Sequence, residues 1–116
     1  MPKLYFASPR DLPVTRPLPG VTERTIHGRD ATVRITDLAP RTIVETHRHD
    51  DERLGVIVRG SVAMVIAGEQ RILTEGDTFV VPASAAHGLR VLEQGTQVLE
   101  VAAAVPSTRA GSDREE

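Results

Sequence analysis

Two histidines stand one residue apart in the stretch ETHRHDDERLG, residues 45–55. Along a β-strand, side chains at positions i and i+2 point to the same face, with Cα atoms about 6.7 Å apart. His47 and His49 can therefore converge on one metal ion, and imidazole nitrogen suits divalent transition metals. The pair alone leaves a second interpretation open, in which both histidines face solvent or make structural hydrogen bonds.

A third histidine follows in the stretch GDTFVVPASAAHGL, residues 76–89, after a turn glycine, an apolar run and a proline. Together the two stretches resemble the two motifs of the cupin superfamily, G-x5-H-x-H-x3,4-E-x6-G and G-x5-P-x-G-x2-H-x3-N. The resemblance covers residues 20–104, and the matching positions are His47, His49, Gly60, Gly76, Pro82 and His87. Three motif positions differ, because Arg41 and Ser84 replace glycines and Val91 replaces the asparagine.

The resemblance implies an all-β fold, a double-stranded β-helix or jelly-roll barrel, with a metal site inside its mouth. It also implies that His47, His49 and His87 bind one divalent transition metal, which could be zinc, iron, nickel, manganese or cobalt. Three imidazole ligands leave coordination positions open for water or substrate, as in catalytic rather than structural metal sites.

The family's usual fourth ligand, a glutamate or glutamine, falls here at Arg53 or Leu54, and neither side chain can bind a metal. Glu52 lies one position short, so strand alternation would turn it away from the site unless the loop bulges. Glu45 is in phase with both histidines but lies outside the family's ligand position. Glu52, Glu45 and water are therefore the alternatives for the fourth ligand.

Arg53 stands where an acid is expected, and its charge limits where it can lie. A guanidinium about 5 Å from a divalent ion is repelled by about 7 kcal/mol at an effective dielectric constant of about 20. Arg53 is therefore expected either to pair with Asp50, Asp51 or Glu52 at the surface, or to clamp an acidic substrate. As catalytic residues we take Arg53 in this clamp role and Glu52 as a general base.

The elements that must position these residues are short strands. Five prolines before residue 20 exclude a helix there and favour an extended arm, in which Tyr5 and Phe6 are expected to anchor against the barrel or a partner subunit. From residue 21, short β-branched runs alternate with turn signals, which predicts eight or nine antiparallel strands and no long helix. The AGE at 67–69 predicts a tight hairpin with Gly68 at positive φ.

The domain organisation follows from these patterns. We expect an extended arm over 1–20, a cupin barrel over 21–105 and a disordered, polar tail over 106–116. Surface positions are expected for His27 and for the strand arginines Arg34, Arg71 and Arg90, of which the last could also line the mouth. The residues expected in the core and at interfaces are Val56, Val58, Val62, Met64, Ile66, Phe79 and Val81.

The composition excludes several classes of function. A net charge of −2 and a pI near 6.1 give no general attraction to nucleic acid or to an anionic membrane. The chain has no cysteine, so thiolate metal sites and disulfides are impossible. No segment has the pattern of a signal peptide or a membrane span, and we expect a cytoplasmic protein. The resemblance to cupins further suggests a homodimer that binds a small, possibly acidic, molecule.

These observations favour a metal-dependent enzyme that acts on an enolisable carbonyl, hydroxy-keto or carboxylate substrate. Among the cupins that the chain resembles are sugar-acid isomerases, polyketide cyclases and dioxygenases, and we expect a cyclase or isomerase rather than a dioxygenase. The alternative is a non-catalytic cupin that binds or senses a small ligand, its metal site degraded by the loss of the carboxylate.

Overall fold

The computed structural model describes residues 5–104, and within them the chain forms ten strands and one short 3₁₀ helix. The first four residues and the predicted tail over 106–116 lie outside this range. The elements are η1 (Pro9–Asp11), β1 (Val14–Thr15), β2 (Val21–His27), β3 (Ala31–Leu38), β4 (Ile43–His47), β5 (Arg53–Arg59), β6 (Ser61–Ile66), β7 (Glu69–Thr74), β8 (Thr78–Val81), β9 (His87–Val91) and β10 (Thr96–Ala103).

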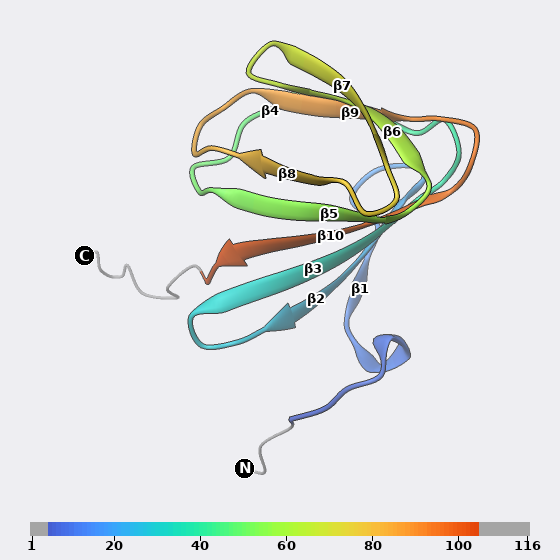
Figure 1. Ribbon diagram of the computed structural model, residues 1–116. Helices are drawn as coiled ribbons and strands as arrows, with labels where there is room; N and C mark the ends of the chain where they lie inside the picture. Colours follow the sequence, from blue (N-terminus) through green and yellow to red (C-terminus); the bar gives the residue numbers. More distant parts are fainter. Residues whose placement is uncertain (1–4, 105–116) are drawn as a thin grey trace.

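Two antiparallel sheets face each other in this fold (Figure 1). One has six strands in the order β1-β2-β3-β10-β5-β8, and the other has four in the order β4-β9-β6-β7. Strands distant in sequence lie side by side in both sheets, as in a jelly roll. The predicted all-β, cupin-like class is therefore confirmed. Within the described residues, no helix is long and apolar enough to cross a membrane.

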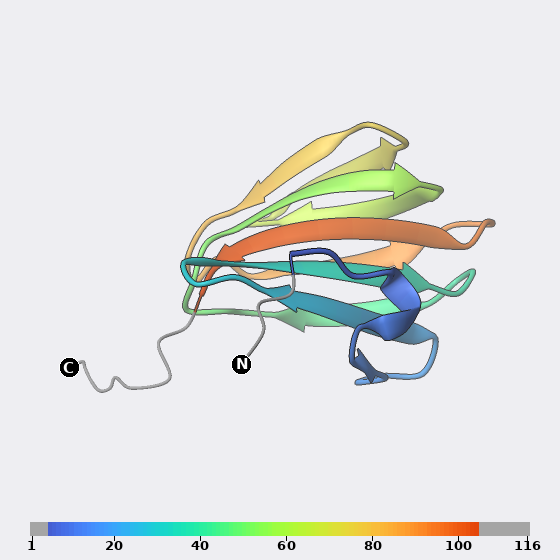
Figure 2. The ribbon, with the colours of Figure 1, turned by 90° about the horizontal axis from the view of Figure 1, so that it is seen from below.

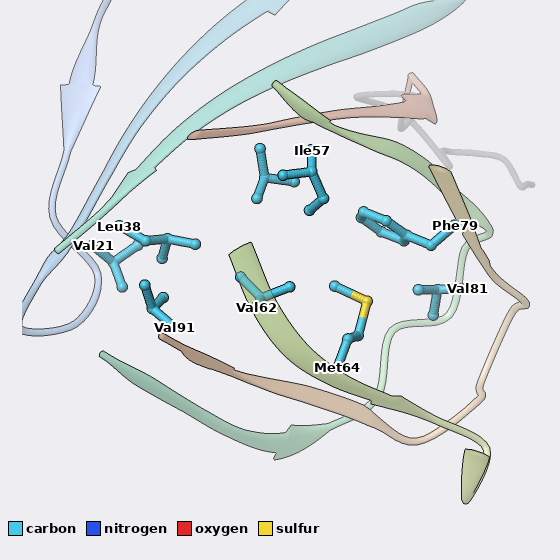
Figure 3. Close-up of a cluster of buried hydrophobic side chains, with 9 residues drawn as sticks. Val21, Leu38, Ile57, Val62, Met64, Phe79, Val81 and Val91 are labelled. Atoms are coloured by element: carbon cyan, nitrogen blue, oxygen red, sulfur yellow. The ribbon is translucent and has the colours of Figure 1, made fainter. Parts of the chain in front are cut away.

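The hydrophobic core lies between the two sheets (Figure 3). Ile57 of β5 and Val81 of β8 meet Val62 of β6 and Val91 of β9, and these four side chains are fully buried. Because alternate residues of a strand point to opposite faces, Ile57 in the core turns its neighbour Val58 outward. Val58 is 39% exposed and lies outside the core, so of the predicted core and interface positions only an interface position remains for it.

Most of the predicted strands are confirmed, and two differences matter for the site. The strand expected to run through the first histidine pair ends at His47, so His49 lies in the β4–β5 loop. The arm contributes a strand that was not predicted, β1, which pairs with β2 through Val14 and Arg24. β1 has only two residues, Val14 and Thr15, and both are exposed, so it shows no alternation of buried and exposed positions that could indicate a strand. Figure 2 shows η1 and β1 at the opposite end of the molecule from the β2–β3 turn.

The predicted hairpin over 67–69 is confirmed. Ile66 pairs with Glu69, which leaves a two-residue turn in which Ala67 has φ 50° and Gly68 has φ 86°. Positive φ at both central residues is the geometry of a type I′ turn, whose twist matches that of the flanking strands.

Candidate metal centre

The three histidines come from two adjoining loops and the strand ends beside them. His47 is the last residue of β4 and pairs directly with His87, the first residue of β9, while His49 follows in the β4–β5 loop. This loop is tied to the β8–β9 loop, because Ser84 N donates a hydrogen bond to the His49 carbonyl (2.7 Å) and Arg48 donates one to the Ser84 carbonyl (2.8 Å). The two loops therefore hold His47, His49 and His87 as one unit.

Two residues of these motifs have a backbone conformation that glycine usually supplies. Arg41 and Ser84, which replace the glycines of the two cupin motifs, both have φ 64°. Left-handed backbone is costly for residues with a Cβ. Arg41 and Ser84 thus adopt a left-handed backbone without being glycine. The backbone N–H and C=O of Ser84 make the two hydrogen bonds that join the loops.

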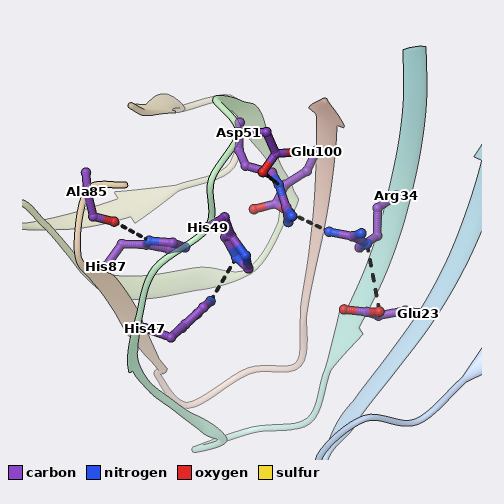
Figure 4. Close-up of polar contacts among 9 residues, drawn as sticks. Glu23, Arg34, His47, His49, Asp51, Ala85, His87 and Glu100 are labelled. Atoms are coloured by element: carbon purple, nitrogen blue, oxygen red, sulfur yellow. Dashed lines mark hydrogen bonds and ion pairs between the residues drawn. The ribbon is translucent and has the colours of Figure 1, made fainter. Parts of the chain in front are cut away.

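The imidazole nitrogens face one another (Figure 4). One ligand atom from each of His47, His49 and His87 lies within 4.8 Å of the other two. The Nδ1 atoms of His47 and His87 lie 2.8 Å and 2.9 Å from the carbonyl oxygens of Glu45 and Ala85. Since a carbonyl can only accept, each Nδ1 must carry the proton, and each Nε2 is left with a free lone pair.

This donor set fits a divalent metal ion. His47 Nε2 and His49 Nε2 are 3.0 Å apart. This separation is compatible with both nitrogens binding one ion, since two atoms each about 2.1 Å from the same ion lie within about 4.2 Å of each other. With imidazole donors the group could hold zinc, iron, nickel, manganese or cobalt, and nothing in the donor set selects among them.

The pKa of His49 is lowered from 6.5 to about 4. The largest cause is burial, which disfavours the charged imidazolium, followed by the positive charge of Arg53 and then by His47 and His87; Asp51 opposes the shift. His49 is therefore neutral at pH 7, which is the form that binds metals.

The histidines line a cavity of about 430 Å³ between the two sheets. A volume of this size is typical of small-molecule sites, for which the usual range is about 300–1,000 Å³. Most of the cavity wall is apolar. The apolar lining residues are Pro17, Leu18, Val21, Leu38, Ile43, Val44, Met64, Phe79, Val81, Leu89 and Val98.

Arg53 lies in this cavity and only 12% of its side chain is exposed. Its Nε is 3.3 Å from Asp51 Oδ1 and its Nη1 is 3.7 Å from Glu100 Oε1. The pairing with Asp51 agrees with the first alternative for Arg53, whereas its position in the cavity rather than at the surface agrees with the second. The two carboxylates balance the guanidinium charge, which reduces its repulsion from an ion at the histidines.

The two acids considered as a fourth ligand lie in different places. Glu52 is exposed and is not among the residues that line the cavity, so neither the ligand role nor the general-base role has support from its position. Glu45 does line the cavity, but its side chain is exposed and its carbonyl is the group that holds His47.

Three charged residues of the cavity were not expected there. Arg34 on β3 lies between Glu100 on β10 (3.6 Å) and Glu23 on β2 (3.8 Å), and all three line the cavity. The expectation that Arg34 lies on a solvated face is therefore wrong. The missed signal is the alternation itself, since Arg34 and Thr36 share a strand face with the core residue Leu38.

The remaining predicted residues lie away from the histidines. His27 and Arg71 are exposed as expected, and Arg90 borders a shallower groove rather than the main cavity. Tyr5 and Phe6 are 78% and 92% exposed, so neither packs against the barrel of its own chain.

Comparison with known proteins agrees with the fold. The family described as "Cupin domain" matches residues 34–101. The pectin degradation protein KdgF of Dickeya dadantii is 34% identical over 55 residues, which are 47% of this chain and 50% of that protein. The match thus spans half the length of this curated relative.

Two solved structures have a similar fold. KdgF from a Halomonas species superimposes with a TM-score of 0.80 at 22% identity, covering 90% of this chain and 97% of that one. The polyketide cyclase RemF from Streptomyces resistomycificus gives a TM-score of 0.74 at 18% identity, covering 87% and 80%. At these identities the likeness concerns the fold alone.

Proposed function

Because this chain belongs to the cupin family, we propose that it is a metal-dependent enzyme that acts on a small enolisable carbonyl, hydroxy-keto or carboxylate substrate. The observation that carries the proposal is the convergence of His47, His49 and His87 in a largely apolar cavity. A divalent ion bound there would supply Lewis acidity toward a carbonyl, enol or carboxylate oxygen.

The residues of the chain would prepare the site in three ways. The carbonyls of Glu45 and Ala85 fix the tautomers of two histidines, so their Nε2 lone pairs are available without rearrangement. The apolar wall excludes water and strengthens electrostatic interactions inside the cavity. Glu100 lines the cavity beside Arg53 and is better placed than Glu52 to accept a proton from a substrate carbon or hydroxyl.

The names of the relatives support cyclase or isomerase chemistry. The similar proteins include a pectin degradation protein and a polyketide cyclase, and a further relative, 27% identical over 89 residues, is named H2HPP isomerase from Bacillus subtilis. Another relative, 36% identical over 77 residues, is named the cupin-domain-containing oxidoreductase fogC of Aspergillus ruber, and its name favours redox chemistry instead.

A second candidate function is non-catalytic binding of a small ligand. The observation that favours it is Arg53, which occupies the position of the family's carboxylate ligand and is held by Asp51 and Glu100. With three histidines and no carboxylate, a weakened metal site could serve recognition alone.

Metal analysis tests the first part of the proposal. Protein purified without chelator should contain close to one divalent ion per chain, and His87→Ala should remove most of it, because two remaining imidazoles bind far more weakly. His27→Ala, at an exposed histidine, is the matched control and should keep the metal. Removing the ion with a chelator should lower the melting temperature. Wild-type protein that contains no metal when purified without chelator, and that melts at the same temperature as His87→Ala, would contradict the proposal.

Activity assays distinguish the metal-dependent enzyme from the non-catalytic binding protein. Phenylpyruvate is a simple enolisable substrate, and its enol can be followed by ultraviolet absorbance while dissolved oxygen is recorded with an electrode. Enol–keto exchange that is faster than the buffer rate, absent in His87→Ala and without oxygen uptake supports a cyclase or isomerase. Oxygen uptake with a flavonol or a diketone would instead indicate a dioxygenase. Binding without turnover across such substrates favours the non-catalytic function.

A further inference from the structure

We propose that Arg34 and Arg53 form a carboxylate-binding subsite in the cavity, and that the substrate is a hydroxylated carboxylic acid of the sugar-acid type. This inference rests on the proposed function, because it names the substrate class of the same cavity. The new assignment is Arg34, because this residue lies outside both histidine motifs and they do not indicate a role for it.

The two arginines share one wall of the cavity. Arg34 on β3 pairs across the sheet with Glu100 on β10, and Arg53 on β5 pairs with Ala102, two residues further along β10. Positions two apart on a strand face the same side, so Arg34, Glu100 and Arg53 all point inward from the six-stranded sheet. In this charged row, Glu23, Arg34, Arg53 and Glu100 line the same cavity as the histidines, whereas Asp51, which pairs with Arg53, is not part of the cavity lining (Figure 4).

The guanidinium groups of the row retain donors for a ligand. Charge-assisted N–H···O bonds are about 2.7–2.9 Å long. Arg34 lies 3.6 Å from Glu100 and 3.8 Å from Glu23, so neither contact reaches that length. Arg53 lies 3.7 Å from Glu100 and makes its hydrogen bond to Asp51 at 3.3 Å. A ligand carboxylate would supply two acceptors in the geometry that a guanidinium matches.

The acids of the row define the rest of the ligand. The carboxylates of Glu23 and Glu100 in the cavity, together with Asp51 beside Arg53, already neutralise the two arginines, so a simple anion would gain little from the row as a whole. Their oxygens are, however, acceptors that hydroxyl groups can satisfy. A molecule that carries a carboxylate and neighbouring hydroxyls can use both kinds of group. A cavity of about 430 Å³ admits a six-carbon acid.

Calorimetric titration of the metal-loaded protein tests the subsite. The probes are D-galacturonate and D-galactose, which differ by a carboxylate in place of a hydroxymethyl group. We expect galacturonate to bind at least about tenfold more tightly than galactose, as for a charge-assisted hydrogen bond. Arg34→Gln and Arg53→Gln should each remove most of this preference. Arg71→Gln, at an exposed arginine on β7 outside this cavity, should leave it unchanged.

Two further variants keep the test decisive. Arg34→Lys retains the charge that balances Glu23 and Glu100 but loses the bidentate geometry, so it should fold and still lose several-fold in galacturonate affinity. Equal affinity in Arg34→Lys, Arg34→Gln and wild-type protein would overturn the subsite, as would a wild-type protein that does not prefer galacturonate. If His87→Ala removes the metal and galacturonate binding while both Arg34 variants bind normally, the carboxylate binds at the metal, and only the subsite fails. If the wild type holds no metal but binds galacturonate through Arg34, only the proposed function fails.

Discussion

His49 lies in an environment that opposes its protonation. Burial and the neighbouring Arg53 lower its pKa to about 4 in the folded chain, against 6.5 as its ordinary value. Between these two values the unfolded state binds more protons than the folded state, so the free energy of unfolding falls as the pH falls from 6.5 to 4. Below pH 4 both states carry the proton, and this contribution declines no further.

We therefore predict that the free energy of unfolding of the metal-free protein falls as the pH is lowered from 6.5 to 4, and that protonation of His49 causes part of this fall. Urea unfolding in the presence of a chelator, repeated across this range, measures the effect. His49→Gln should show a shallower decline, because the glutamine does not titrate. Parallel declines for the variant and the wild type would show that acids elsewhere account for the whole pH dependence.

Ser84 has the left-handed backbone of a motif glycine but carries a Cβ. That conformation costs a residue with a side chain about 1–2 kcal/mol, while glycine loses about 0.5–1 kcal/mol more in conformational entropy on folding. Ser84→Gly should therefore raise the free energy of unfolding by about 1 kcal/mol or less, as measured by urea denaturation. Ser84→Ala, which keeps the Cβ, is the control and should give no gain. A loss of stability in Ser84→Gly would mean that the serine side chain has a role of its own.

At the scale of elements, the close approach of β4 and β9 brings His47 opposite His87. Gly88 permits it, because a Cβ there would lie 2.8 Å from the carbonyl oxygen of Val44 and 3.1 Å from the amide nitrogen of Thr46. Both are backbone atoms, which cannot move without shifting β4. An added methyl group would thus displace the strand that ends in His47.

Gly88→Ala is accordingly predicted to lower metal affinity by about tenfold or more, the range found when groups that orient metal ligands are removed. Competition with a metal-binding dye measures it. Gly95→Ala is the matched control, because the same Cβ at Gly95 would meet its nearest atom, the Leu38 carbonyl, at an ordinary 3.6 Å. Metal affinity that is equal in both variants would show that β4 adjusts without moving His47.

Local patterns in the sequence were enough to predict most of the strands, the Ala67–Gly68 turn and the three histidines that the structure brings together. Each depends on residue types that are close in sequence, or on motif spacings that the chain retains. His49 differs slightly, since it reaches its partners from a loop rather than from a strand.

The charged wall of the cavity was not predicted. Arg34 was expected to face solvent, as charged residues of half-buried strands usually do, and no position was predicted for Glu100. The alternation of β3 places Arg34 on the same face as Leu38, but which face is inside depends on the pairing of β3 with β10, which joins residues far apart in the chain. An apolar residue type likewise does not show which face it occupies, and Val58 lies on the outer face.

At the scale of the whole molecule, the six-stranded sheet has an apolar row on its outer face, directly behind the charged residues of the cavity. The residues next to Arg34, Glu100 and Arg53 point away from the cavity, and they pair across five strands. This outer row consists of Ile26, Val33, Val101, Leu54 and Val80. Ile26, Leu54 and Val80 are 44%, 46% and 52% exposed. An antiparallel sheet that faces water usually has polar outer residues, so this row is typical of a covered face.

The homodimer expected from the sequence would cover this face, because two copies of the row can pack on each other about a two-fold axis. We predict that the protein elutes with about twice its 12.6 kDa chain mass when light scattering is recorded during gel filtration. Leu54→Lys places a charge within the row and should shift the mass toward that of one chain. Ile72→Lys, at a residue that is 56% exposed on the other sheet, should not. A monomeric wild type would contradict the dimer, and a dimer disrupted by Ile72→Lys but not by Leu54→Lys would place the interface on the four-stranded sheet instead.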